Sequence, residues 1–363
     1  SETLVTATRS AQPLTDVVAD VTVIDREALE RSGATGIADV LSRVPGLSMS
    51  RNGGPGSTTS LFVRGAESRF TAVLIDGIRV DSQSTGGASW HGIPLAQIER
   101  IEIVRGPAAA VYGSDALGGV IQIFTRRGTT RLAPSVGLGV GSHGTQQLDL
   151  TLSGREGALD YAIGVSRERT RGFNVQPAGN PDRDGYANTS ATLRLTQTLA
   201  PGHALSAGWL HSDGRLDYDS AFNTPADLQT SRTRKDMLHL RSENTIRKGW
   251  DSSLTLSTQR EDVRQHASGA FGFDSRYLTG GHGLNWVNTL ELGAGRPAIA
   301  AWWRDTKEKY QAVVEPLETR ERGDVSTVGA RVTVAITVMA IATKNRPQPA
   351  EPLSRRRPKI GGR

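Results

Sequence analysis

The chain has 363 residues, a formal net charge of +6 and no cysteine, which excludes disulfides and thiolate metal sites. Residues 296–363 hold 14 Lys and Arg against 7 Asp and Glu, so all of the positive excess lies in this segment. The first 295 residues therefore lack the basic stripe that nucleic-acid binding needs. The apolar run Val332–Thr343 is too short for a transmembrane helix.

Residues 1–128 combine helix and strand patterns. A helix is predicted between Gly33 and Pro45. Its apolar residues at helical spacing are Ile37, Val40, Leu41 and Val44. The stretch "TAVLIDGIRV" (71–80) predicts a hairpin with an Asp-Gly turn. The β-branched runs "IEIV" (101–104) and "VIQIF" (120–124) predict two short strands with turn residues between them.

Residues 133–295 alternate apolar and polar side chains with a period of two, in segments separated by turn residues. Clear cases are "LDLTLSG" (148–154), "LDYAIGV" (159–165) and "GLNWVNTLEL" (283–292). Segments of about 10 residues with one apolar and one charged face are typical of transmembrane β-strands. A soluble β-sandwich also alternates, so the pattern favours a membrane barrel and leaves the sandwich open.

Sequence motifs of enzymes are not found. The seven His residues are scattered without metal-ligand spacing, and there is no nucleophile elbow of the form GxSxG. "GLGVGS" (137–142) is not followed by a helix pattern, so it is not a dinucleotide fingerprint. We therefore expect no enzymatic activity.

Several motifs, in chain order, resemble the plug domain of TonB-dependent outer-membrane receptors. They are "DVLSRVPGLSM" (39–49), "LFVRGAESRFTAVLIDGIRV" (61–80) and "IERIEIVRGPAAAVYGSDALGGVIQIFTRRG" (98–128). The resemblance implies an α+β plug domain at 11–128, followed by the N-terminal part of an antiparallel transmembrane β-barrel at 129–295. It also implies a place in the outer membrane of a Gram-negative cell, in contact with its lipid.

Within this family the chain resembles most the receptors that transport cobalamin (vitamin B12). The residues behind this are "ETLVTATR" (2–9), "RNGGPGSTTSLFVRG" (51–65) and "VYGSDALGGVIQI" (111–123). A ferric-siderophore receptor of the same fold and a soluble β-rich binding protein are the alternatives. The loops 52–60 and 81–94 contain no Lys or Arg, which suits nearly neutral cobalamin better than an anionic siderophore complex.

The first ten residues resemble a TonB box, the segment that a TonB-type inner-membrane energy transducer grips. An extended terminal segment can add a strand to the edge of a partner's sheet through main-chain hydrogen bonds. A frayed terminus is the plainer interpretation. The residues expected to bind the transducer are Glu2, Thr3, Leu4, Val5, Thr6 and Ala7.

The resemblance places the loops 52–60 and 81–94 at the outer apex of the plug, where ligand binds. Glycine there lets backbone amides approach a large polar ligand. Trp90 either stacks on the corrin or packs inside the plug. The expected ligand-binding residues are Asn52, Gly53, Gly54, Ser57, Thr58, Thr59, Gln83, Ser84 and Trp90.

Two further groups of charged residues are expected to have roles. Arg64 and Arg105 should form ion pairs with carboxylates on the inner face of the barrel, because an unpaired buried charge is costly. Four loop carboxylates could bind Ca²⁺, as comparable loops do in the cobalamin receptors, although solvated loop acids explain them equally well. They are Asp182, Asp184, Asp217 and Asp219.

The last segment, 296–363, departs from the strand pattern and contains 6 of the 16 prolines. We expect it to be disordered or foreign to the barrel, through truncation or a frameshift. About eight strand segments precede it, whereas plugged transporters have about 22 strands. The chain alone is therefore expected not to transport.

Overall fold

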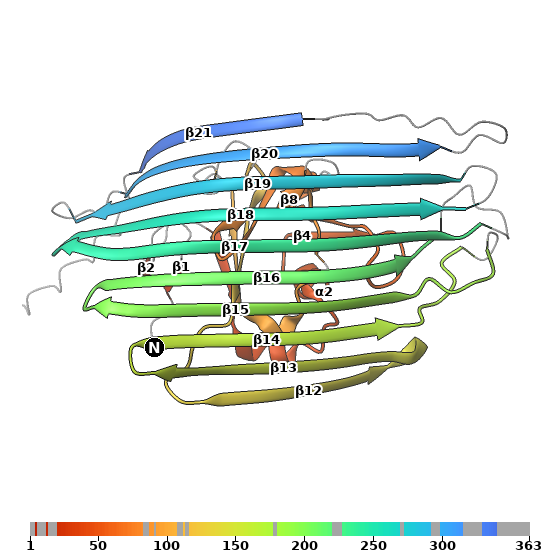
Figure 1. The fold of residues 1–363 in the computed structure, drawn as a ribbon, viewed down its shortest axis with the longest axis horizontal. Helices are drawn as coiled ribbons and strands as arrows, with labels where there is room; N and C mark the ends of the chain where they lie inside the picture. The colour runs from red at the N-terminus through yellow and green to blue at the C-terminus, as the bar shows by residue number, and fades with distance from the viewer. Residues whose placement is uncertain are drawn as a thin grey trace, which may run out of the picture.

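The computed structural model describes most of the chain (Figure 1). The described residues are 4–5, 12–13, 20–82, 87–90, 92–106, 112, 116–176, 180–219, 227–268, 272–291, 298–314 and 329–339. They form a small mixed domain, here called the plug (20–125), and one long antiparallel sheet, here called the wall (133–339). In Figure 1 the plug lies behind the wall.

The plug is built on a five-stranded sheet with the order β3-β10-β11-β6-β7. β11 pairs with β6 in parallel, and the other neighbours pair antiparallel. These strands are β3 (Asp20–Ile24), β6 (Thr71–Ile75), β7 (Ile78–Arg79), β10 (Ile98–Arg105) and β11 (Gly119–Thr125). The smaller elements are α1 (Arg26–Arg31), α2 (Ile37–Ser42), β4 (Leu47–Arg51), β5 (Thr59–Val63), β8 (Asp81–Ser82), β9 (Gly87–Ala88), η2 (Ser68–Phe70) and η3 (Leu95–Gln97).

The local predictions for the plug are confirmed. The expected helix is α2, and its apolar residues, together with Val44, are buried in the plug core. The predicted hairpin joins β6 to β7, with Asp76 at φ +50° and Gly77 at φ +85°. Positive φ at both central residues is the type I′ geometry that fits the twist of a hairpin.

The wall is a ten-stranded meander from β12 to β21 in which every strand pairs antiparallel with the next. Its strands are β12 (Ala133–Gly141), β13 (Thr145–Glu156), β14 (Leu159–Thr170), β15 (Tyr186–Ala200), β16 (His203–Asp217), β17 (Gln229–Arg247), β18 (Trp250–Ala267), β19 (Phe273–Leu290), β20 (Ala298–Val314) and β21 (Gly329–Met339); η5 (Ser142–Gly144) joins the first two. Turns of two residues close the hairpins β13–β14, β15–β16 and β17–β18 at one end, and the long connections β14–β15 and β16–β17 lie at the other.

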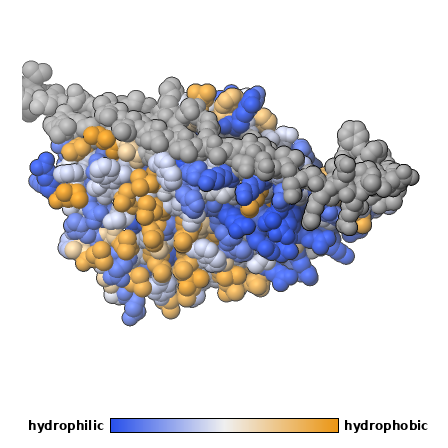
Figure 2. Space-filling model, turned by 45° about the horizontal axis from the view of Figure 1, so that its top comes forward, coloured by the Kyte–Doolittle hydropathy of each residue, from blue (hydrophilic) through white to orange (hydrophobic). Residues whose placement is uncertain are grey.

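The wall has an outward face that is apolar where a soluble protein would be polar. Leu138 is 81% exposed and Leu240 is 47% exposed, and cross-strand pairing continues this apolar band from strand to strand. The inward neighbours Leu210 and Met237 instead join the buried core of the plug. Figure 2 shows hydrophobic side chains over part of the surface and hydrophilic ones gathered towards one end. This arrangement agrees with a membrane barrel and not with a soluble sandwich.

The expectation that residues 296–363 are disordered is wrong for two ranges, which form β20 and β21. β20 pairs with β19 over 17 residue pairs, and β21 pairs with β20 over 11. In the register of this pairing, Val334 lies opposite Trp303 and Ile336 lies opposite Ala301. The prolines and charges of this segment lie largely elsewhere, in ranges outside the described residues. Whether the segment is native to the gene stays a hypothesis.

Among the described residues, no helix has both the length and the apolar character needed to cross a membrane.

Candidate functional site: the plug apex, an acidic loop and the plug–wall contact

The glycine-rich loop 52–58 connects β4 to β5 and lies against the loop that joins β14 to β15. A Cβ on Gly53 would lie 3.3 Å from Val175, and one on Gly54 would lie 3.8 Å from the ring of Phe173. Gly56 has φ +84°, and a Cβ there would lie 2.2 Å from the ring of Tyr186. These glycines therefore bring the apex close to the wall.

The expected ligand-binding residues separate into exposed and buried ones. Asn52 and Thr58 are exposed at the apex. Ser57 is buried, and Thr59 is half-buried, with its hydroxyl donating to the carbonyl of Ser57. Trp90 is 7% exposed and belongs to the plug core, so the packing interpretation of this residue holds. Gln83 and Ser84 lie outside the described residues.

The space between the apex and the wall is small. A cavity of about 70 Å³ is lined on the plug side by Arg51, Gly56 and Trp90 and on the wall side by Glu168 and Asn188. Such a volume holds a few water molecules at most. A ligand as large as a corrinoid must therefore bind outside the plug–wall contact, above the exposed residues of the apex.

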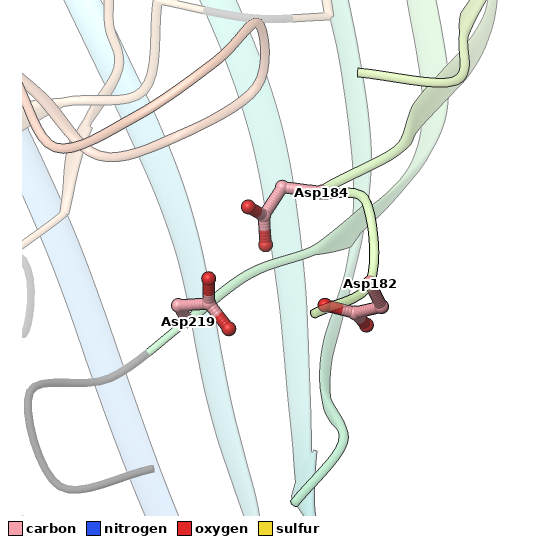
Figure 3. Close-up of side chains that lie close together, drawn as sticks. All are labelled: Asp182, Asp184 and Asp219. Carbon is pink, nitrogen blue, oxygen red and sulfur yellow. The ribbon is translucent and has the colours of Figure 1, made fainter. Parts of the chain in front are cut away.

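Three of the four expected metal-binding carboxylates lie together beside the apex (Figure 3). One oxygen each from Asp182, Asp184 and Asp219 lies within 4.8 Å of the others. Asp217 is not in this group, and its Oδ1 accepts a hydrogen bond from Arg215 instead. The backbone carbonyl of Asp184 lies against Gly54, which joins the acidic group to the apex loop.

The acidic group is under electrostatic strain, because its members are partly desolvated and repel one another. Burial, and then the charges of Asp219 and Asp182, raise the pKa of Asp184 to about 6. Burial, followed by Asp219 and Asp217, also raises the pKa of Asp182. A bound cation would relieve both effects.

Unpaired oxygens show that this group fits a cation. Oδ1 of Asp182 and Oδ1 of Asn174 are buried without a hydrogen-bond partner. The amides of Val175 and Gln176 donate to Asp184 and Asp219, which fixes these carboxylates towards the same loop. Several oxygens on loops with excess negative charge are the donor set that Ca²⁺ prefers. Asn174 directly precedes Val175 in this loop and offers an amide oxygen.

The expected partners of Arg64 and Arg105 are wrong. Both guanidinium groups bind Asp20 of β3, inside the plug, and Nη1 of Arg105 lies 2.9 Å from its Oδ1. Arg105 also donates to the hydroxyl of Thr22. β10 pairs with β3, so the nearest carboxylate to Arg105 is across the strand and not on the wall.

The buried ion pair between plug and wall is made instead by Asp76, in the β6–β7 turn. Nη1 of Arg194 on β15 lies 2.6 Å from Oδ1 of Asp76, and both side chains are less than 10% exposed. Thr125 donates to the same carboxylate from its amide and its hydroxyl, and Arg241 of β17 donates to the Asp76 carbonyl. Burial alone would raise the pKa of Asp76, but Arg194 and the Thr125 hydrogen bonds leave this pKa below its usual value.

Gln97 of the plug and Arg126, directly after the plug, donate further hydrogen bonds to the wall. Gln97 donates to Ser166 of β14 over 3.1 Å, and Arg126 donates to Thr151 of β13 over 2.8 Å. At the N-terminus, Leu4–Val5 (β1) pairs antiparallel with Gln12–Pro13 (β2). The other expected transducer-binding residues, Glu2, Thr3, Thr6 and Ala7, lie outside the described residues.

Comparison with known proteins identifies the family. Residues 13–120 match the family model described as TonB-dependent Receptor Plug Domain. The vitamin B12 transporter BtuB of Photobacterium profundum is 32% identical over 321 residues, which cover 84% of this chain and 50% of that protein. The chain belongs to the TonB-dependent outer-membrane receptors.

A second relative in this family is the vitamin B12 transporter BtuB of Vibrio cholerae serotype O1 (strain ATCC 39541 / Classical Ogawa 395 / O395). It is 33% identical over 264 residues, covering 71% of this chain and 43% of that protein. The chain thus spans about half the length of the curated relatives it matches. Because the match to the first relative covers 84% of this chain, it extends beyond the plug into the strands of the wall.

Solved structures agree on the fold. The pyoverdine outer-membrane receptor FpvA of Pseudomonas aeruginosa PAO1 has a TM-score of 0.75 at 13% identity, covering 93% of this chain and 56% of that one. The ferric citrate transporter FecA in its unliganded form has a TM-score of 0.68 at 19% identity, covering 90% and 53%. Both show the plug-and-barrel architecture and nothing about the ligand.

Proposed function

We propose that the full-length receptor containing this sequence binds cobalamin at the outer apex of its plug and imports it across the outer membrane with energy from TonB. The observation that carries the proposal is the match to vitamin B12 transporters along 84% of the chain. The local charge supports it as well. The apex loop has no Lys or Arg, and the acidic group lies directly beside it. An anionic ferric siderophore would be repelled there, whereas a nearly neutral, amide-rimmed ligand would not.

The ligand contacts are expected from the exposed part of the apex. Asn52 offers a donor and an acceptor, and Thr58 offers a hydroxyl, which suit the amides around a corrin ring. Bulky substitutions at Ser57 or Trp90 would disturb the plug core before they reached a ligand, because both side chains are buried. Asn52 and Thr58 are therefore the positions at which binding can be changed without unfolding.

A calcium ion held by Asp182, Asp184 and Asp219 belongs to the same proposal. The ion would neutralise three converging carboxylates and so stabilise the β14–β15 loop against the apex. Its contribution to ligand binding would be indirect, through the contact between Asp184 and Gly54.

The TonB partner is expected to take the N-terminal segment by adding a strand. Leu4 pairs with Pro13 across β1 and β2, so the segment already adopts extended geometry. Leu4→Pro removes a backbone donor and blocks strand addition. In the full-length receptor carrying this substitution, uptake of labelled cyanocobalamin should fall to background while binding at the cell surface persists. Normal uptake by Leu4→Pro would remove this segment from the mechanism.

The ligand is tested by titrating the detergent-solubilised full-length receptor, in calcium, with cyanocobalamin and with a panel of ferric siderophores. Saturable binding of cyanocobalamin is expected, with no response to the siderophores. Asn52→Ala together with Thr58→Val should weaken this binding, and Thr198→Val, at an exposed position near the short-turn end of β15, should not. Binding of a siderophore without binding of cobalamin would assign the chain to the siderophore receptors.

A further inference from the structure

A belt of charged side chains replaces the apolar band at the long-loop end of the wall's outward face. On β16, Trp209 is followed on the same face by His211, Asp213 and Arg215. On β17, Leu238 is preceded on the same face by Asp236, Arg234 and Arg232. In this family the long loops are extracellular, so the belt lies where the outer leaflet ends. The hydrophilic region at one end of Figure 2 includes this part of the surface.

The belt contains a hollow of about 970 Å³. Its rim is formed by Arg215 of β16, Arg232 of β17, Arg264 of β18 and Arg276 of β19, which cross-strand pairing places on one face. Short side chains of β15 line it as well. In total five arginines and three carboxylates line the hollow, and one of these acids, Glu168, belongs to the inward face. Positive charge therefore dominates on the outward side.

Two aspartates hold the arginines in place and use only some of their N–H donors. The carboxylate of Asp213 accepts hydrogen bonds from Nε and Nη2 of both Arg232 and Arg234. The carboxylate of Asp262 accepts hydrogen bonds from the same atoms of Arg264 and Arg276. Each carboxylate thus serves two guanidinium groups, which leaves a net positive charge in each cluster. A guanidinium has five N–H donors, so several remain on each arginine. Arg232 and Arg264 keep more than half of their side-chain surface exposed.

We propose that this hollow binds the phosphorylated head group of a lipid in the outer leaflet. Guanidinium forks match phosphate oxygens in geometry and charge, and the two aspartates hold the forks in place. The apolar band begins at Trp209 and Leu238, the next same-face pair after His211 at the edge of the hollow, and the acyl chains of the same lipid would lie there. A free anion would make no use of this adjacent band. A volume near 970 Å³ suits a head group of disaccharide size.

The plainer explanation is a network of surface ion pairs, each worth about 0–1 kcal/mol. That explanation accounts for Asp213 and Asp262 but not for two arginines on each of them. An ion-pair network at a water-exposed surface would also be expected to balance its charges. Excess guanidinium next to a lipid-facing band instead matches an anionic membrane surface.

The test compares diphosphorylated lipid A with its dephosphorylated form, added to the detergent-solubilised protein and followed by native mass spectrometry. The diphosphorylated lipid should bind at least about tenfold more tightly, because charge-assisted hydrogen bonds are lost without phosphate. The triple variant Arg232→Gln/Arg264→Gln/Arg276→Gln should abolish this preference. The control Arg131→Gln/Arg155→Gln/Arg247→Gln removes the same charge from exposed arginines at the short-turn end and should keep it.

Each outcome decides the proposal. Equal binding of the two lipids, or a preference that survives the triple variant, would overturn it. Displacement of the lipid by millimolar inorganic phosphate alone would identify a free-anion site and also overturn it. If the triple variant melts early in lipid-free micelles, Arg232→Gln alone carries the test, since Asp213 keeps Arg234 as a partner. That single variant should still reduce the preference.

Discussion

The plug and the wall of this receptor place their apolar side chains in opposite ways. In the plug, Leu41 and Ile103 are fully buried, and the exposed positions are mainly polar. In the wall, Leu138 and Leu240 are exposed while Ser190 and Thr306 are buried. The plug follows the rule for proteins in water, and the wall follows the rule for strands with lipid on one side and a polar interior on the other. The contact between them must therefore be largely polar.

The largest effect is expected where the two regions meet, at Asp76. Asp76→Asn preserves the shape of the side chain and tolerates the positive φ, but leaves Arg194 buried without a charge partner. Removing one member of a buried pair costs about 3–5 kcal/mol. The double variant Asp76→Asn/Arg194→Gln should recover part of this loss. Urea unfolding of the plug, followed by the fluorescence of Trp90, measures the loss in the single variant and the recovery in the double variant. An unchanged urea midpoint in Asp76→Asn would contradict the assignment of a buried ion pair to Asp76 and Arg194.

The same pair predicts how stability depends on acid. The pKa of Asp76 is lower in the folded protein than in the unfolded chain, so its contribution is complete above the unfolded value near 3.9. The contribution is lost as the pH falls below that value through the folded pKa. Attachment of the plug should thus be constant from pH 7 to about pH 5 and weaken in stronger acid. Asp76→Asn should lack this component of the acid transition.

A pair of leucines tests the contrast itself. Leu41→Ala opens a cavity in the plug core and should cost about 2–5 kcal/mol of unfolding free energy. Leu240→Ala removes the same atoms from the outward face of the wall, where detergent or lipid fills the space, and should cost much less. Unfolding in urea and in the same detergent compares them. Equal costs would mean that the outward face is packed against protein.

Gly56 tests the contact between the apex and the wall with a matched control. Both Gly56 and Gly65 have positive φ, but only at Gly56 would a Cβ collide, with Tyr186. Gly65→Ala should cost about 1 kcal/mol through backbone strain alone. Gly56→Ala should cost more and should also speed amide hydrogen exchange in the loop 52–58. Similar effects of the two substitutions would show that the loop does not press on Tyr186.

The smallest effect on stability concerns the acidic group. Because the pKa of Asp184 is raised to about 6, the ion-free loop loses stability as the pH rises from the unfolded value near 3.9 to about 6, and the loss is complete above that. Added Ca²⁺ should therefore raise the melting temperature at pH 8 and do little at pH 5. Asp184→Asn should remove the response, while Asp217→Asn should retain it. A response independent of pH, or shared by Mg²⁺, would point away from this site.

Much of the fold could be predicted because its signals are local. Alternation between 133 and 295 predicts eight strands, and the structure has eight, β12–β19, before residue 295. The Asp-Gly hairpin was likewise readable from two residues. β21 was missed because its alternation of Val and Ile with Thr and Ala resembles a short apolar run. β20 was missed because its charges conceal the period.

The site was harder to predict because its contacts are not local. Arg194 and Asp76 are 118 positions apart, and no local pattern selects this carboxylate over Asp20. The Asp-Gly turn already accounts for an aspartate at position 76, so nothing in the sequence indicated an ion pair for it. Ser57 and Trp90 carry side chains that suit a ligand, and only packing reveals that they face the plug interior. The acidic group was found because three of its members lie close to loop signals in the sequence.

The central claim is that cobalamin binds on the outer surface of the plug apex, above its exposed residues and beside the β14–β15 loop. Hydrogen–deuterium exchange of the detergent-solubilised receptor, with and without cyanocobalamin and in calcium throughout, tests it directly. Exchange should slow in residues 52–59 and 171–176, and should not change at the turn 157–158 on the opposite end of the wall. Saturable binding with protection confined to other parts of the chain, or no binding of cobalamin at all, would contradict the account.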